Sequence, residues 1–173
     1  TERKVADTFE GYDFPIIRYA EVLLNYAEAM YELGTTGKAL DDALNISLNL
    51  VRLRVNPDMP KLTTSFASEN SLNMREEIRR ERTIELYNEG FRVDDLKRWN
   101  TAIVEMPKPI LGVKWTGTDF ATSWAGASNM AKDSDGCLIL ENSRRWGSKN
   151  DLYPLPVDQC QLNPNLGQNP GWQ

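Results

Sequence analysis

The sequence predicts a mainly α-helical protein, built from tetratricopeptide-like helical hairpins that are followed by a long irregular loop region and an extended C-terminal tail. Three observations predict this class. Apolar residues recur at three- and four-residue steps through most of residues 15–100, this periodicity disappears over residues 101–150, and prolines recur through residues 151–173. We therefore expect a helical scaffold, a variable loop region and a closing tail at those boundaries.

The first predicted helix follows Pro15, a residue suited to the first turn of a helix. Its apolar stripe consists of Ile16, Tyr19, Leu23, Tyr26, Met30 and Leu33. Gly34 follows the stripe and ends the helix, because glycine is the residue preferred just beyond a helix C-terminus.

A second stripe predicts one further helix before Pro57. It consists of Leu40, Ala43, Leu44, Leu50 and Val51. The short glycine-containing turn over residues 34–37 would join the two helices as an αα-hairpin, which loosely resembles a tetratricopeptide repeat. Residues 56–72, which are rich in Pro, Ser and Thr, are predicted to be a linker.

The third predicted helix opens at Asn73, with Glu76 placed three residues later as in a capping box. Met74, Ile78 and Leu86 would form its apolar side. Gly90 is expected to interrupt this helix, and residues 94–99 would add a further turn or two.

The loop region and tail contain few regular elements. Short strands are predicted at residues 110–115 and 137–141, and the proline-rich tail is expected to run extended over a surface. The two cysteines, Cys137 and Cys160, match no metal motif, so they form either one disulfide or two free thiols.

Composition limits the classes of function. Apolar residues make up 40% of the chain and charged residues 26%, which is typical of a globular protein. The net charge of −5 provides no positive field for nucleic acid, so no nucleic-acid partner is expected. The chain has no histidine, which excludes the Ser-His-Asp and Cys-His catalytic arrangements and the usual histidine-containing zinc sites. We expect no metal and no other cofactor.

No apolar run approaches the ~20 residues of a membrane span. The N-terminus lacks a signal-peptide pattern, and the chain starts at Thr1 rather than Met. We therefore expect the targeting segment to lie outside these 173 residues.

Charged side chains are dense in the third predicted helix. Arg82, Glu85, Glu89 and Arg92 follow steps of three and four, and with Arg79 they predict a structural ion-pair network. The alternative is that Glu85 and Glu89 act as acid and base or bind a metal. Neighbouring arginines would keep both carboxylates ionised, which argues against acid–base catalysis.

These charges belong to a motif that resembles the C-terminal signature of the SusD/RagB family. The matching residues are Ile78, Arg79, Glu81, Arg82, Glu85, Leu86, Glu89, Gly90, Arg92, Asp95, Leu96, Arg98 and Trp99. Residues 15–34 and 151–172 resemble two further family segments. The chain departs from the family pattern at Thr83, where Arg is common, and at Trp172, where Tyr or Phe is common.

The resemblance implies that residues 1–173 are the C-terminal part of a SusD-like domain, made of tetratricopeptide-like helix pairs. It also implies a non-catalytic, surface-exposed lipoprotein of the outer membrane, anchored by a lipid outside this chain. Such a protein works with a SusC-like TonB-dependent transporter and binds a glycan or, in some relatives, a peptide. The alternatives left open are a glycan-cleaving enzyme fragment and a helical module that only recruits another protein.

Candidate ligand-binding residues are the tryptophans of the loop region, Trp115, Trp124 and Trp146. Flat aromatic rings stack on the apolar faces of sugars, although tryptophans also anchor loops in a core. An enzyme would instead use loop carboxylates such as Asp119 and Glu141. Residues 133–136 could open a calcium loop, but a tight turn fits the spacing better.

Overall fold

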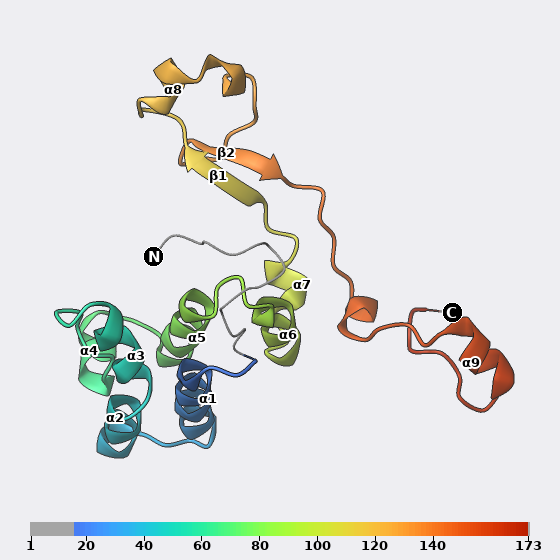
Figure 1. Ribbon diagram of the computed structural model, residues 1–173, viewed down its shortest axis with the longest axis horizontal. Coiled ribbons are helices and arrows are strands. Elements are labelled where there is room, and N and C mark those ends of the chain that lie inside the picture. Colours follow the sequence, from blue (N-terminus) through green and yellow to red (C-terminus); the bar gives the residue numbers. More distant parts are fainter. Residues whose placement is uncertain (1–15, 173) are drawn as a thin grey trace, which may run out of the picture. The chain divides into compact units, whose positions relative to one another are not determined.

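The computed structural model describes residues 16–172 and confirms the mainly α class (Figure 1). The chain divides into two compact units between Arg92 and Val93, and each unit is described separately below. Among the described residues, no helix combines the length and the apolar content that a membrane span requires.

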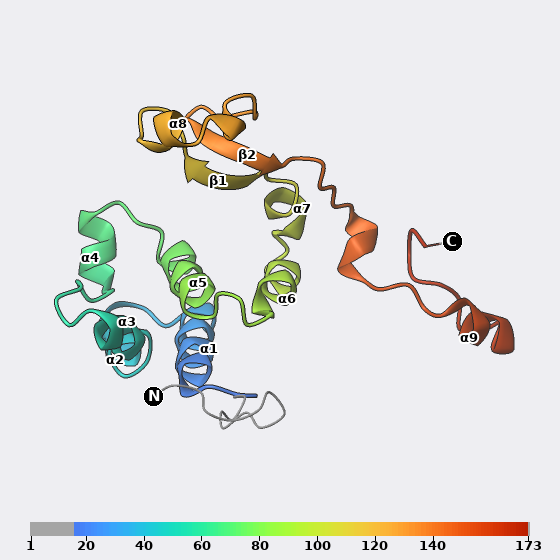
Figure 2. The same ribbon diagram turned by 45° about the horizontal axis from the view of Figure 1, so that its top comes forward.

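The first unit is a set of packed helices. They are α1 (Tyr19–Glu32), α2 (Gly37–Asn45), α3 (Leu48–Val55), α4 (Thr64–Glu69) and α5 (Met74–Glu85). Helix α1 packs against α2, α3 and α5, and α2 also contacts α4 (Figures 1 and 2). Apolar side chains from these helices and from the α3–α4 connection form one core, which includes Leu24, Ala27, Leu44, Leu48, Leu62 and Ile78.

The predicted first helix is confirmed as α1, although it begins at Tyr19 rather than Ile16. Gly34 follows it with a φ of +82°, a conformation that glycine adopts without strain. Pro15, the expected start signal, lies outside the described residues.

The prediction of one helix over residues 40–51 is wrong, because the chain forms α2 and α3 with a break at Ile46 and Ser47. Ser47 is fully buried and adopts φ −136° and ψ −98°. Its hydroxyl donates a 2.6 Å hydrogen bond to the carbonyl oxygen of Ala43, four residues earlier. Such a bond competes with the backbone pattern of a helix. The apolar stripe gave no sign of this break, since both helices bury their apolar sides in the same core.

The predicted linker over residues 56–72 contains a helix that was not predicted, α4. The hydroxyl of Thr63 accepts a hydrogen bond from the N–H of Phe66 and caps the helix. Before it, the buried Asn49 side chain accepts from the N–H of Leu62 at 2.8 Å and donates to its carbonyl at 2.9 Å. Side-chain bonds to the backbone therefore order this segment.

Helix α5 begins as predicted, with the Asn73 side chain accepting from the N–H of Glu76. It ends at Glu85, and α6 (Phe91–Arg98) starts after a turn in which Asn88 and Gly90 have positive φ. The predicted interruption at Gly90 is confirmed, but the first helix ends five residues before that glycine.

Arginines from other parts of the unit bind the carboxylates of α5 and the following turn. Glu85 accepts hydrogen bonds of 2.9 Å from Arg18, just before α1, and from Arg54 of α3. Arg18 also donates to Glu89, at 2.7 and 2.9 Å. Hydrogen bonds to Glu89 and Glu85 raise the pKa of Arg18 above its ordinary value. The Glu85 side chain is only 10% exposed, so its two cations offset the cost of burying its charge.

A second ion pair joins α3 to α5 and is buried on both sides. Arg52 binds Glu81, and their side chains are 7% and 12% exposed. Arg52 also donates from Nε to the carbonyl oxygen of Pro60 at 3.2 Å. Burial raises the pKa of Glu81, and the positive charge of Arg52 opposes that shift.

The remaining charges of the predicted network also contact neighbouring residues. Arg79 lies 3.7 Å from Glu76, Arg82 donates to the Asn25 side chain at 2.7 Å, and Arg92 donates to the Thr83 hydroxyl at 2.9 Å. That Arg79, Arg82, Glu85, Glu89 and Arg92 act together as one network stays a prediction.

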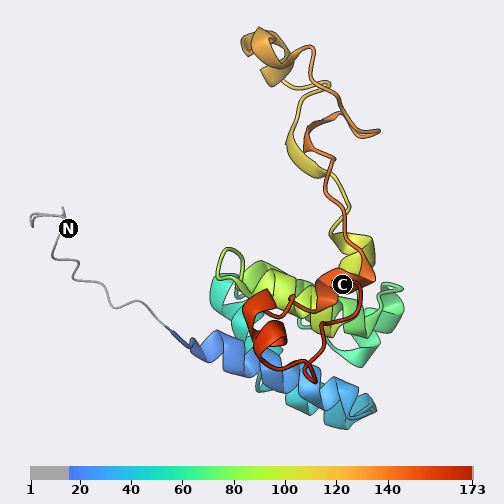
Figure 3. The ribbon, with the colours of Figure 1, turned by 90° about the vertical axis from the view of Figure 1, so that its right-hand side faces the viewer.

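The second unit combines short helices with a β-hairpin (Figures 1 and 3). Its elements after α6 are α7 (Ala102–Glu105), β1 (Ile110–Lys114), α8 (Phe120–Ser123), the 3₁₀ turn η1 (Ala125–Ala127), β2 (Cys137–Glu141), the 3₁₀ turn η2 (Ser148–Asp151) and α9 (Val157–Leu162). Both predicted strands are confirmed, and they pair antiparallel with Ile110 opposite Glu141 and Lys114 opposite Cys137.

The tail is not extended throughout, because α9 forms directly after Pro156. Two side-chain amides hold the tail together. Gln168 accepts from the N–H of Leu155 at 2.7 Å and donates to its carbonyl at 2.8 Å, and Asn169 donates to the carbonyl of Tyr153 at 2.6 Å. We call these contacts of Gln168 and Asn169 the amide clasp. The indole N–H of Trp172 adds bonds to the carbonyls of Lys149 and Leu152.

We predict that Arg52→Met lowers the free energy of unfolding by about 3 kcal/mol or more at pH 8, because it leaves the buried Glu81 carboxylate without its cation. The pKa of Glu81 is raised in the folded protein, and losing Arg52 raises it further. A raised pKa stabilises the fold below the unfolded pKa, near ~4.3, and that stability is lost as pH rises. Urea unfolding should therefore show a smaller defect at pH 5 than at pH 8.

Arg54→Met is the matched control for this test, since Arg54 lies two residues later on α3 and its side chain is 60% exposed. It should cost about 1 kcal/mol or less. A defect of equal size in both variants, independent of pH, would contradict the account of Glu81.

We also predict that Gln168→Glu opens the tail locally. A carboxylate cannot donate to the carbonyl of Leu155, so the clasp loses a bond and gains a repulsion. Hydrogen exchange at the Leu155 amide should accelerate by about tenfold, corresponding to ~1.4 kcal/mol. Gln161→Glu, on the exposed side of α9, should leave this rate unchanged.

Candidate functional site

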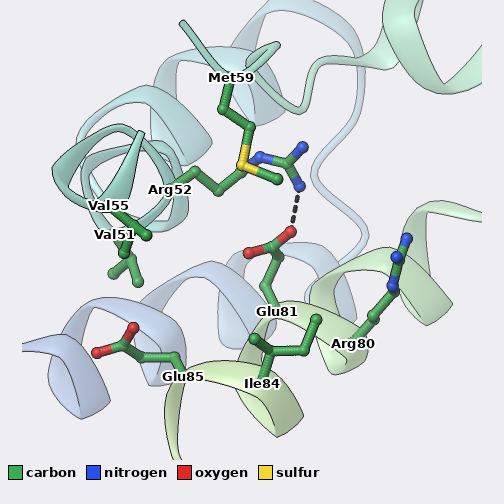
Figure 4. A pocket seen from close by; sticks show the side chains of 8 residues that line it. All are labelled: Val51, Arg52, Val55, Met59, Arg80, Glu81, Ile84 and Glu85. Atoms are coloured by element: carbon green, nitrogen blue, oxygen red, sulfur yellow. Dashed lines mark hydrogen bonds and ion pairs between the residues drawn. The ribbon is translucent and has the colours of Figure 1, made fainter. Parts of the chain in front are cut away.

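A small groove lies between α3 and α5 in the first unit (Figure 4). Its lining residues are Val51, Arg52, Val55, Met59, Arg80, Glu81, Ile84 and Glu85. The cavity has a volume of about 150 Å³, smaller than the ~300–1,000 Å³ typical of sites for small molecules. Figure 4 shows the Glu81 carboxylate turned toward the Arg52 guanidinium. Both carboxylates of the groove already bind arginines, so the groove offers no free acid–base group.

The tip of the β-hairpin brings together two of the three candidate tryptophans. The ring centroids of Trp115 and Trp124 lie 6.2 Å apart, and the ring planes are tilted by 55°. Trp115 is 5% exposed and forms a small core with Ala127 and Leu138, whereas Trp124 is 56% exposed. Trp115 therefore fits the alternative of a loop anchor, and Trp124 lies against it with much of its surface accessible.

Local structure explains why Trp115 is held in place. It follows β1, and its N–H donates to the carbonyl of Gly136 at 2.8 Å, which continues the hairpin pairing. Gly136 has a φ of +80°, and a Cβ atom there would lie 2.5 Å from the Thr116 side chain. Only glycine fits this approach without displacing its neighbours. The hairpin thus provides a fixed base for Trp124.

Two further residues of this region were not singled out from the sequence. Phe120, at the start of α8, is 49% exposed and precedes Trp124 by four residues, a spacing that places the two on one side of a helical turn. Lys132 has its ammonium group 5.7 Å from the Trp115 ring centroid. The four-residue spacing of the two aromatics could have identified Phe120, whereas nothing in the sequence pattern indicated Lys132.

Trp146 lies in a different setting within the same unit. Its indole N–H donates to Asp151 at 3.0 Å. The ammonium group of Lys97, on α6, lies 5.7 Å from the Trp146 ring and 4.0 Å from the Tyr153 ring. These cation–π contacts fix residues 146–153 against α6, so Trp146 is better explained as an anchor than as a ligand contact.

Of the two loop carboxylates named for a cleaving enzyme, Glu141 lacks the property required of a proton donor. Hydrogen bonds from the hydroxyl and N–H of Ser143 lower the pKa of Glu141. A glycosidase needs one carboxyl group whose pKa is raised, so that it can donate a proton. Asp119 precedes α8, and its carbonyl accepts from the hydroxyls of Thr122 and Ser123. Glu141 is thus set up to remain ionised.

Residues 133–136 form a tight turn. The Asp133 carboxylate accepts from the N–H groups of Asp135 and Cys137, at 3.0 and 2.8 Å. Over residues 16–172, no group of three or more Cys, Asp or Glu side chains is arranged to hold a metal ion. The turn interpretation is therefore the better one.

The cysteine alternatives resolve to two free thiols. The Cys160 thiol lies 3.2 Å from the carbonyl oxygen of Gly167, to which it donates a hydrogen bond. Cys137 starts β2 and is half-buried.

Comparison with known proteins places these features in a family. The SusD family model matches residues 2–172. A SusD-like carbohydrate binding protein from Bacteroides fragilis is 31% identical, with a TM-score of 0.67, and the match covers 88% of this chain and 28% of that protein. A second SusD-like protein from Bacteroides fragilis is 30% identical, with a TM-score of 0.62, covering 90% and 25%. A search of curated proteins gave no match.

The chain spans only about a quarter of the length of these solved structures. The part that it does span includes the paired helices, the charged α5–α6 segment and the tail, in the same order as the three motifs in the sequence. With a family match that covers nearly all of its residues, this chain belongs to the SusD family.

Proposed function

We propose that this chain is part of a non-catalytic nutrient-binding subunit that takes up glycans at the surface of the outer membrane. The observation that carries the proposal is the accessible ring of Trp124, held on the buried Trp115 at the tip of the hairpin. The similarity to a SusD-like carbohydrate binding protein supports the ligand class.

The geometry at the hairpin tip suits a sugar. An exposed aromatic ring offers a flat apolar face, and the C–H face of a pyranose can cover it, removing apolar surface from water. The indole N–H of Trp124 has no protein hydrogen-bond partner in the described structure, so a ligand hydroxyl can accept from it. Phe120, four residues earlier in the chain, is also half exposed.

One feature of the same region supports binding without cleavage. Glu141, on the strand that returns from the tip, has a lowered pKa and stays ionised, so it cannot serve as a proton donor. The bound glycan would instead be handed to a SusC-like TonB-dependent transporter. A lipid outside these residues would hold the subunit at the outer membrane.

We predict that Trp124→Ala weakens glycan binding about tenfold, because the loss of an aromatic contact of this kind costs ~1–1.5 kcal/mol. Isothermal titration calorimetry of the purified protein against a panel of neutral and acidic oligosaccharides measures this. The matched control is Tyr87→Ala, which removes a more exposed aromatic ring from the turn after α5. Equal affinities for the parent protein and Trp124→Ala would exclude this ring as the platform.

The transporter partnership has a separate test. A tagged form of the protein, expressed in its native host, should copurify from detergent-solubilised outer membranes with a TonB-dependent transporter. Since the partnership does not require the sugar platform, Trp124→Ala should copurify equally well. Recovery of the protein without a transporter, at native expression levels, would refute the partnership.

A further inference from the structure

The chain between α8 and β2 carries the exposed ring of Trp124 (Figure 1). We call residues 124–130 the tip loop. Its backbone hydrogen bonds are local: the N–H of Ala127 donates to the carbonyl of Trp124 at 3.3 Å, and the N–H of Met130 donates to the carbonyl of Ala127 at 3.1 Å. The Ala127 side chain also joins the small core of Trp115 and Leu138, but one methyl group buries little apolar surface. A further contact is needed to hold the tip loop on the β-hairpin.

Lys132 provides this contact. Its backbone pairs with the hairpin, because Lys132 forms an antiparallel bridge with Leu138, and the carbonyl of Ala131 accepts from an N–H of β2 at 2.8 Å. The side chain then reaches back along the chain. Its ammonium group donates to the carbonyls of Ser128 and Met130, both at 2.9 Å. The tip loop is thereby joined to a residue that the hairpin holds in place.

The same ammonium group lies near the buried ring that Trp124 contacts. Nζ of Lys132 is 5.7 Å from the Trp115 ring centroid, within the range of a cation–π contact. The Trp115 and Trp124 centroids are 6.2 Å apart. The Trp124 indole is also close to the tip loop itself, since a Cβ atom on Gly126 would lie 3.8 Å from its Nε1. One charged group therefore contacts both the loop that carries Trp124 and the ring against which Trp124 lies.

The two carbonyl groups that Lys132 binds depend on its charge. Both oxygens lie 2.9 Å from one nitrogen atom, so they converge on a single point. Without the ammonium group they would repel each other, and each would lose a hydrogen bond to a charged donor, the stronger kind. Water can replace the donor, but water carries no covalent link to the hairpin. The tip loop could then move away from β2 and take the Trp124 ring with it.

We propose that Lys132 is a positioning residue for the proposed glycan site: its ammonium group holds the tip loop on the hairpin and keeps the Trp124 ring against Trp115. Two of the three N–H donors of the ammonium group serve the loop, so Lys132 acts through Trp124 and not as a ligand contact. Its effect on glycan binding rests on the proposed function. Its effect on the position of the ring does not, and can be measured without a ligand.

Lys132→Met tests the proposal, because methionine keeps an unbranched apolar side chain and removes the charge. Two tryptophan rings this close couple their electronic transitions and give a paired signal in far-ultraviolet circular dichroism, which the difference between the parent protein and Trp124→Phe isolates. This signal should fall by about half or more in Lys132→Met and persist in Lys132→Arg, which still donates to carbonyl oxygens. The matched control is Lys114→Met, at an exposed lysine that ends β1, and it should leave the signal unchanged.

In calorimetry with the oligosaccharide panel, Lys132→Met should bind about fivefold more weakly, because binding must then order the tip loop. A full dichroism signal in Lys132→Met would overturn the proposal. So would loss of hydrogen-exchange protection at the Ile139 amide, which pairs with Ala131, because Lys132 would then be required for folding of the hairpin itself. A lost signal with unchanged glycan affinity would support the positioning role and count against the proposed function of Trp124. If the parent protein binds no glycan, the proposed function fails, and the dichroism signal still decides the role of Lys132.

Discussion

The carboxylates of α5 hold the helices of the first unit together. Glu81 binds Arg52 of α3, and Glu85 binds both Arg54 of α3 and Arg18 at the start of α1. Each of these carboxylates is nearly buried, so each must have its cation, and that requirement fixes α1 and α3 relative to α5. The hydrophobic core alone would tolerate small sliding movements of the helices, because dispersion contacts are not directional. The ion pairs are directional and specify one arrangement.

The sequence predicted which segments are helical much better than it predicted what they contact. Periodicity identified α1 and α5, and the two short strands were also predicted. It missed α4 and the break between α2 and α3, since single side chains decide both: the Thr63 hydroxyl caps α4, and the Ser47 hydroxyl replaces part of the helical pattern. Likewise, helical spacing suggested partners for Glu85 on its own helix. The arginines that bind it lie 31 and 67 residues away, a separation that no local pattern encodes.

For the candidate site, too, the sequence predicted the residues but not their contacts. From the sequence, three tryptophans were equally good candidates for ligand binding: Trp115, Trp124 and Trp146. Each of them is an isolated tryptophan in an aperiodic region. Tertiary structure separates them into a core residue, an accessible ring and an anchor beside Lys97. Different interactions therefore determine the structure of the helical scaffold and the structure of the hairpin tip. Charges and core residues of the scaffold constrain one another, whereas the tip uses the hairpin pairing and Gly136 to support its exposed ring.

The amide clasp allows the length of the C-terminal segment to change. A β-ladder would fix the register of every residue along it, but Gln168 and Asn169 fix only the two ends of the segment between Leu155 and Gln168. Residues added within that segment would lengthen a closed ring without altering its closure, and each doubling of a loop costs only ~0.6 kcal/mol. The turn after α9 is thus a place where an epitope or a fluorophore can be inserted while the clasp, Trp172 and the hairpin keep their contacts.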